Sequence, residues 1–175
     1  MGFDISGHNP KINTEEKDYP LIVKYDFRNF KSWQERQDAM EQSGDETKYW
    51  EQYNKHLEEN PGIYFRNNVW WWRPLWSFVC EHCDDILDEE DMERGCYNDH
   101  HLITEDKAMK IAVKLNSLLL DKTVEEYEKN HEEKRAKDKD SDNEDVKFMA
   151  SYPFCKENIE RFAKFCEESG GFIIS

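Results

Sequence analysis

The residues best suited to grip a ligand lie in one run, "YFRNNVWWWRPLW", at positions 64–76. Guanidinium groups hold phosphate or carboxylate, side-chain amides read the edge of a base, and indole rings stack on planar groups. This combination predicts a site for a planar anionic, nucleotide-like small molecule or for a partner protein. The candidate ligand-binding residues are Tyr64, Arg66, Asn67, Asn68, Trp70, Trp72 and Arg73.

The geometry of this run decides which of its side chains meet. Pro74 disfavours helical geometry at Arg73 and suits the first turn of a helix, so we expect a strand over 63–73 and a helix after it. A strand alternates its side chains between two faces, and one of these faces is then mostly core. The other, binding face carries Tyr64, Arg66, Asn68, Trp70 and Trp72.

Two other arrangements of the same run stay open. The fold can bury tryptophans on both faces of a strand, in which case they are core and not a site. The pair Asn67 and Asn68 tolerates positive φ and also fits a hairpin turn, which would change the faces. In every geometry three consecutive indoles point to different sides, so at least one of them needs a second environment.

A second candidate site has the spacing of metal ligands. The pattern Cys80-x2-Cys83-x12-Cys96-x3-His100 is close to that of small zinc modules, in which thiolates and an imidazole surround the ion. Zinc is therefore the candidate cofactor, with these four residues as its ligands. The alternative is that Cys83 lies on the apolar stripe of a helix and is an ordinary buried thiol.

Catalysis has less support than binding in this sequence. The cluster "NDHH" at 98–101 can offer Asp99, His100 and His101 to a hydrolytic metal centre. The sequence contains no phosphate-cradling P-loop, no dinucleotide fingerprint and no nucleophile elbow. We therefore expect a binding protein without catalytic residues, and keep a metal-dependent hydrolase as an alternative.

Acidic residues dominate the stretch from Glu81 to Asp106, where eleven carboxylates stand against Arg94 alone, a net charge of −10 (1 minus 11). Carboxylates displayed on one surface can imitate the phosphates of DNA and occupy a nucleic-acid-binding protein. An acidic decoy is therefore the second candidate function. The simpler interpretation is a solvated helical face that keeps an aromatic-rich chain in solution.

Composition limits the remaining classes. A chain of 175 residues fits a single domain. Its net charge of −15 argues against direct contact with nucleic acid or with an anionic membrane. An odd number of cysteines, five, and the lack of a leader-like or membrane-spanning stretch predict reduced thiols in a cytoplasmic protein. An oligomer is compatible with all of these features.

Periodicity predicts an α+β fold that is mostly helical, with a small sheet made by short N-terminal, central and C-terminal strands. The segments "GFDISG" and "GGFIIS" have the character of the terminal strands, and we expect them to pair. Two helices over 31–59 are separated at Gly44, and further helices begin near Thr104 and Cys155. Charged residues from about 132 to 147 predict a mobile linker.

Three stretches resemble small uncharacterised proteins encoded in bacteriophage and bacterial genomes. They are "YFRNNVWWWRPLW", "CYNDHH" and "SYPFCKENIERFAKFCEESGGFII". The resemblance covers about half of the chain and implies a phage-encoded role, such as countering host defence. It carries no function, cofactor or site residue of its own. Capture of a nucleotide signal and an acidic decoy both fit that setting, and neither needs catalysis.

Overall fold

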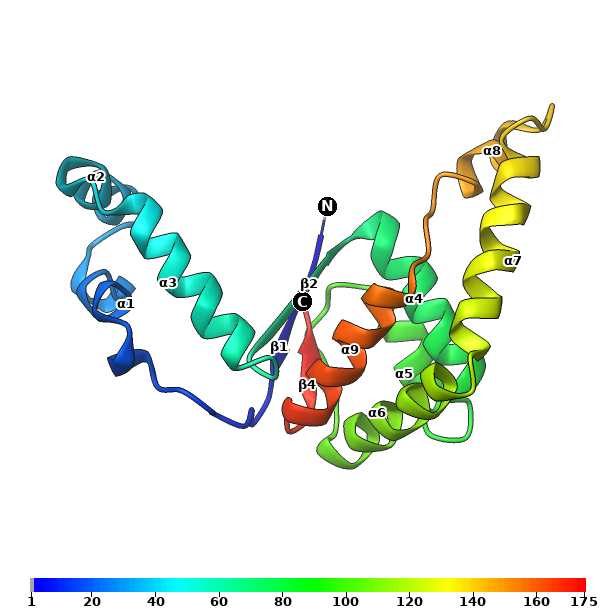
Figure 1. Ribbon diagram of the computed structural model, residues 1–175, viewed down its shortest axis with the longest axis horizontal. Coiled ribbons are helices and arrows are strands. Elements are labelled where there is room, and N and C mark those ends of the chain that lie inside the picture. The colour runs from blue at the N-terminus through cyan, green and yellow to red at the C-terminus, as the bar shows by residue number, and fades with distance from the viewer. Residues whose placement is uncertain (1) are drawn as a thin grey trace. The chain divides into compact units, whose positions relative to one another are not determined.

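The computed structural model describes residues 2–175 and has the predicted α+β class, mostly helical with one small antiparallel sheet. Contacts between residues divide it into two compact units (Figure 1). Residues 12–61 form a helical unit, which is inserted in the sequence between the first two strands. The rest of the described chain forms the sheet unit. The single domain expected across the whole chain stays a prediction.

The sheet is built from both ends of the chain. Its strands are β1 (Gly2–Gly7), β2 (Tyr64–Asn68), β3 (His101–Ile103) and β4 (Phe172–Ile174), in the order β2-β1-β4-β3. Ile5 of β1 lies opposite Ile174 of β4, which confirms the predicted pairing of the terminal strands (Figure 1). β3 has three residues, too few to show an alternation in the sequence.

Helices supply the rest of the sheet unit. They are α4 (Val69–His82), α5 (Glu89–Arg94), α6 (Glu105–Leu120), α7 (Thr123–Asp138), α8 (Glu144–Met149) and α9 (Lys156–Glu168). The helices predicted from their apolar stripes, α6 and α9, bury those stripes in the main core together with residues of α4. The same core takes Phe3, Ile5 and Phe65 from one face of the sheet.

The strand predicted over 63–73 is wrong beyond Asn68, because the chain turns into α4 there. The Oδ1 atom of Asn68 accepts hydrogen bonds from the backbone N–H groups of Trp70 (3.0 Å) and Trp71 (3.2 Å). Asn68 is therefore a helix N-cap and not part of a hairpin turn. Pro74 lies inside the helix, where its missing N–H leaves the carbonyl of Trp70 without its usual helical donor.

The helical unit has a small aromatic core of its own. It contains the 3-10 turns Glu16–Asp18 and Phe27–Asn29 and the helices α1 (Pro20–Lys24), α2 (Trp33–Ser43) and α3 (Glu46–Glu59). The two helices predicted over 31–59 are confirmed, and Gly44 between them has the left-handed φ of 67°. The buried residues of this unit's core are Tyr19, Ile22, Tyr25, Met40 and Tyr49.

The charged segment predicted as a linker is helical over much of its length. α7 continues to Asp138, and α8 begins at Glu144 (Figure 1). The Nε atom of Arg135 on α7 donates to the backbone oxygen of Ala150, 3.0 Å away, and so ties α7 to the residue after α8. The mobility of this segment stays a prediction.

Among residues 2–175, none of the helices combines the length and the apolar character that crossing a membrane requires.

Candidate functional site

The three consecutive tryptophans lie in three environments. Trp72 is fully buried, Trp71 is half-buried, and Trp70 is 38% exposed. Because a helix turns by about 100° per residue, neighbouring indoles on α4 point to different sides. The expectation that at least one indole needs a second environment is confirmed, because Trp70 and Trp71 both lie outside the buried core and Trp70 is the more exposed.

Trp72 belongs to the core. Its ring stacks on Phe3 and on Trp76, with ring centroids 5.4 Å apart in both pairs. Its Nε1 atom donates to the backbone oxygen of Gly95, 2.8 Å away. A Cβ atom on Gly95 would lie 2.1 Å from the Trp76 ring, so only glycine fits beside this stack. Trp72 is a structural residue and is not accessible to a ligand.

A different face of α4 borders a pocket of about 270 Å³, which we call the α4–α7 pocket. Its lining comes from α4, from α7 and from the end of α8 with the segment that follows. The lining residues are Arg73, Pro74, Ser77, Tyr127, His131, Lys134, Arg135, Asp138, Met149, Ala150 and Tyr152. Arg73 is the predicted ligand-binding residue that lies directly in this wall.

Positive charge distinguishes the α4–α7 pocket from the rest of the chain. Arg73, Lys134 and Arg135 line it against the single carboxylate of Asp138, a formal charge of +2 (3 minus 1), although the whole chain carries −15. Among the ion pairs of residues 2–175, none includes Arg73 or Lys134. Arg135 is paired with Glu132. Two of the three cations therefore lack a carboxylate partner within the described chain.

A hydrogen bond and a ring contact, both with Tyr152, hold the guanidinium of Arg73 in place. Its Nη1 atom donates to the hydroxyl of Tyr152, 2.9 Å away, and its central carbon lies 5.8 Å from the centre of that ring. A guanidinium fixed in this way keeps donors on its other nitrogen atoms, in a planar arrangement that suits phosphate or carboxylate oxygens. The pocket can therefore hold an anion with little rearrangement of this side chain.

An apolar rim, formed by Trp70, Phe148 and Met149, lies next to these cations. The ring of Trp70 is 4.8 Å from that of Tyr152 and 5.6 Å from that of Phe148, measured between centroids. Phe148 and Met149 are 53% and 63% exposed. A planar group can stack on this rim while its charge reaches Arg73, because Tyr152 contacts both.

His131 forms part of the pocket wall on α7. Its ring packs against Tyr127 and Phe154. Its Nδ1 atom is, among the described residues, the one buried side-chain nitrogen or oxygen without a hydrogen-bond partner. Burial, with the charges of Arg135 and Lys134, lowers the pKa of His131. The neutral ring thus adds no charge to the wall near pH 8.

The α7 side of the pocket is not predicted from the sequence. Tyr127, His131, Lys134 and Asp138 recur at intervals of three or four residues, and this spacing puts them on one face of a helix. The pattern mixes aromatic and charged types, so a search for apolar stripes does not detect it. A 3.6-residue period in polar and aromatic residues together is the signal that identifies this face.

Tyr64 and Arg66, two other predicted ligand-binding residues, contact a neighbouring strand. The hydroxyl of Tyr64 donates to the carboxylate of Asp4 on β1, and the Nε atom of Arg66 lies 3.4 Å from the same carboxylate. These contacts support the pairing of β1 with β2, and both side chains lie outside the lining of the α4–α7 pocket.

The two asparagines also have structural contacts. Asn67 is buried, and its Nδ2 atom donates to Oδ1 of Asn158 on α9, 3.0 Å away. Asn68 caps α4. Of the seven predicted ligand-binding residues, the structure brings Arg73 into the pocket wall and Trp70 to its rim. It places the other five elsewhere: Tyr64, Arg66, Asn67, Asn68 and Trp72.

The four predicted zinc ligands, Cys80, Cys83, Cys96 and His100, are not brought together as a metal site. Within residues 2–175, no group of three or more His, Cys, Asp and Glu side chains could hold a metal ion. Burial raises the pKa of Cys80 and of Cys83 to about 12. Cys83 is fully buried in the main core, which agrees with the alternative of an ordinary core thiol.

His101 and Asp99 of the "NDHH" cluster have partners of their own. The Nε2 atom of His101 lies 2.8 Å from Oδ1 of Asp91, which is buried and also contacts Lys107. Asp99 forms an ion pair of 2.8 Å with Arg94. The contacts of His101, Asp91 and Lys107 tie β3 to α5 and α6, which gives these three residues a structural role.

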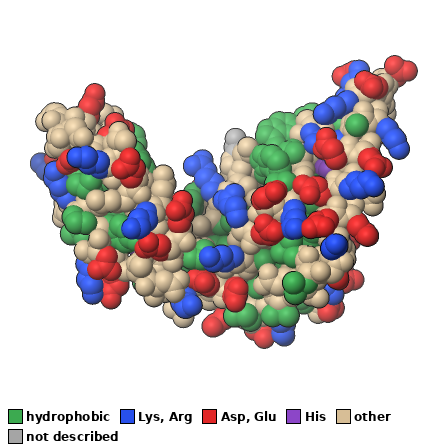
Figure 2. All heavy atoms as spheres, in the orientation of Figure 1, with side chains coloured by type: hydrophobic (Ala, Val, Ile, Leu, Met, Phe, Trp, Pro, Cys, Tyr) green, Lys and Arg blue, Asp and Glu red, His purple; other side chains and the backbone are tan. Residues whose placement is uncertain are grey.

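Ion pairs neutralise part of the acidic stretch 81–106. Lys107, Arg94 and Lys110 pair with five of its eleven carboxylates, namely Asp88, Asp91, Glu90, Asp99 and Asp106. Figure 2 shows acidic and basic side chains interspersed over the visible face of the sheet unit. This distribution agrees with a solvated surface more closely than with a continuous array of phosphate-like charges.

Comparison with protein-family models, with curated proteins and with solved structures finds no match for this chain.

Proposed function

We propose that this chain binds a planar anionic small molecule in the α4–α7 pocket and holds it without chemical change. One observation carries the proposal: a pocket with a formal charge of +2, next to an exposed apolar rim, in a chain of net charge −15. Anions are repelled by the chain as a whole, so a local cluster of cations needs a specific reason. A bound anion supplies that reason.

The size of the pocket supports a small ligand. Ligand pockets typically measure roughly 300 to 1,000 Å³, and 270 Å³ lies just below that range. A mononucleotide fits if its charged group enters the pocket and its base rests on the rim. In the phage setting implied by the sequence resemblance, holding such a molecule would remove a nucleotide signal from a host defence system.

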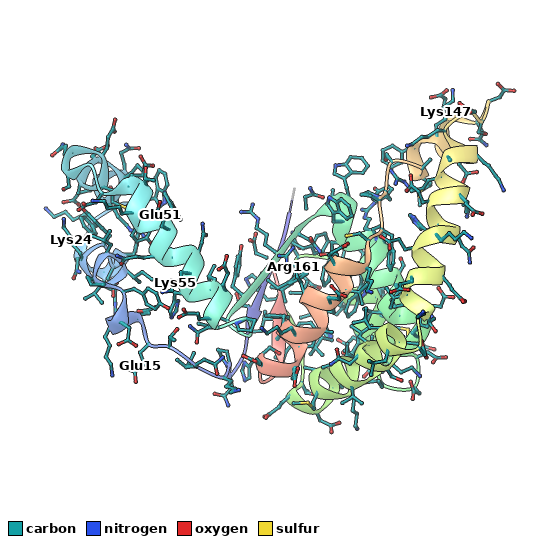
Figure 3. All side chains as sticks on the ribbon, in the orientation of Figure 1. Glu15, Lys24, Glu51, Lys55, Lys147 and Arg161 are labelled. Atoms are coloured by element: carbon teal, nitrogen blue, oxygen red, sulfur yellow. The ribbon has the colours of Figure 1, made fainter. Side chains whose placement is uncertain are left out.

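Binding can be tested by calorimetric titration of the protein with adenosine monophosphate. We expect saturable binding to the wild type and a loss of at least about tenfold in affinity for Arg73→Gln, because a charge-assisted contact is lost. Arg161→Gln is the matched control. Arg161 is exposed and projects from α9, where its guanidinium lies 5.3 Å from the Phe65 ring (Figure 3).

The variant Arg66→Gln separates the two candidate locations for the site. If it weakens binding while Arg73→Gln does not, the ligand binds on the strand face that the sequence predicts, and the α4–α7 pocket is not the site. If the folded wild type binds no nucleotide and no other planar anion, the proposal fails. The alternative of a partner protein would then be the one to pursue.

A further inference from the structure

We infer that the α4–α7 pocket selects a phosphate monoester, which carries two negative charges, over singly charged groups such as carboxylates, sulfate esters and phosphodiesters. This inference rests on the proposed function and names its ligand class. Its basis is the number of cations that the fold leaves without a partner in the pocket wall.

The unpaired cations are Arg73 and Lys134. Glu132 occupies Arg135, whose Nε atom is also bonded to the backbone oxygen of Ala150. Asp138 lines the pocket without an ion pair to either free cation in the described chain. Arg73 on α4 and Lys134 on α7 are thus the two cations of the lining that are free to pair with a ligand, so a dianion can engage both where a monoanion engages one.

The global charge does not cancel this local preference. At physiological ionic strength, charges are screened beyond roughly 8 Å, so the many carboxylates on other surfaces act weakly on the pocket. A charge in contact with Lys134 is screened much less. The second negative charge of a phosphate monoester should therefore gain affinity here, although the protein as a whole is acidic.

The donors in the wall also suit a phosphate. A monoester group has three terminal oxygens that accept hydrogen bonds. Arg73 offers a planar fork, Lys134 offers three rotatable N–H donors, and Ser77 offers an exposed hydroxyl from the next turn of α4. The lowered pKa of His131 keeps its ring neutral at pH 8, so this side chain adds no further charge to the lining.

The test uses two probes of nearly the same shape. Phenyl phosphate is a dianion at pH 8, because its second pKa is about 6, and phenyl sulfate is a monoanion. We expect calorimetry at pH 8 to show that the protein binds phenyl phosphate at least about tenfold more tightly. The ratio should fall below about threefold in Lys134→Gln and return in Lys134→Arg, which restores the charge.

Lys147→Gln is the control for the loss of one positive charge near the pocket. Lys147 projects from α8, pairs with Glu144 at 2.9 Å and lies outside the lining (Figure 3). It should keep the wild-type ratio. An equal drop in Lys147→Gln and Lys134→Gln would overturn the inference, because long-range charge would then explain the selectivity.

The remaining outcomes separate the inference from the proposed function. Equal binding of the two probes overturns selection of a dianion and leaves a general site for planar anions. If the folded wild-type protein binds neither probe and no adenosine monophosphate, both the inference and the proposed function are overturned. Since Lys134 is exposed, its substitution is not expected to unfold the chain.

Discussion

Two faces of helix α4 carry aromatic residues with opposite roles. On the core face, Trp72 and Trp76 are buried and stack on each other, and each indole N–H donates a hydrogen bond to a backbone oxygen. On the pocket face, Trp70 and Arg73 stay accessible beside Tyr152. Residue type therefore does not distinguish a buried tryptophan from an accessible one. What decides is the face of the helix on which the ring lies.

The largest expected effect is on stability at Trp72. Trp72→Ala should lower the free energy of unfolding by about 3–5 kcal/mol, because it removes a fully buried ring from the stack with Phe3 and Trp76. Trp70→Ala should cost less than about 1.5 kcal/mol, since that ring is partly exposed. Urea denaturation measures both. Equal costs would show that the two faces of α4 are not distinct.

Gly95→Ala tests how tightly the core face is packed. The new Cβ would meet the Trp76 ring at 2.1 Å, so we expect a loss of about 1–3 kcal/mol in the free energy of unfolding. Gly2→Ala is the control, because its Cβ would lie 3.5 Å or more from its nearest neighbours, an ordinary contact. If the urea midpoint of Gly95→Ala equals that of the wild type, the ring of Trp76 can move aside and the packing around it is loose.

Thiol reactivity gives a third measure of the contrast between buried and accessible groups. Cys83 and Cys166 are buried, whereas Cys96 is exposed. Desolvation raises the pKa of all three thiols, so accessibility makes the difference between them. At pH 8 a thiol reagent should modify Cys96 first and the two buried thiols roughly a hundredfold more slowly. Peptide mapping by mass spectrometry identifies each site. Early modification of Cys83 would contradict its place in the core.

The smallest expected effect is a pH dependence at His131. Burial lowers the pKa of His131 in the folded state, while the unfolded value is about 6.5, so the folded state binds fewer protons. The contribution of His131 to stability should therefore decrease as the pH falls through about 6.5.

His131→Gln should remove this dependence. The melting temperature of His131→Gln minus that of the wild type should be about 1–2 °C higher at pH 5.5 than at pH 8. His100→Gln, at an exposed position, is the control and should leave the difference between the two pH values unchanged. A constant difference between His131→Gln and the wild type at both pH values would show that the ring titrates normally.

Strong local periodicity made part of the fold predictable. The apolar stripes of α6 and α9 and the helix break at Gly44 follow from patterns within single segments. The pairing of β1 with β4 follows from the need of each short terminal strand for a hydrogen-bonding neighbour. The strand predicted up to Arg73 failed because the rule for residues before proline is local. In the structure Trp72 stacks on Trp76, four residues away, and this contact requires helical geometry through Arg73. The rule for residues before proline does not take such a contact into account.

The candidate site was predictable only in part. Arg73 and Trp70 belong to the run that the sequence analysis selects, and both lie at the pocket or its rim. Most of the lining comes from α7 and from the segment 149–152, which are far from α4 in the sequence. No spacing rule links such segments, because helix packing alone brings them together.

The sheet order has a consequence for the sequence of events during synthesis. The central strands β1 and β4 pair Gly7 with Phe172, which are 165 positions apart (172 minus 7). On the ribosome, β1 emerges long before its partner, and every helix among residues 2–175 is translated between them. Until β4 emerges, one edge of β1 lacks its neighbour, and β3 lacks the only strand with which it pairs among the described residues. Closing this long loop should make completion of the sheet a late and slow step of folding.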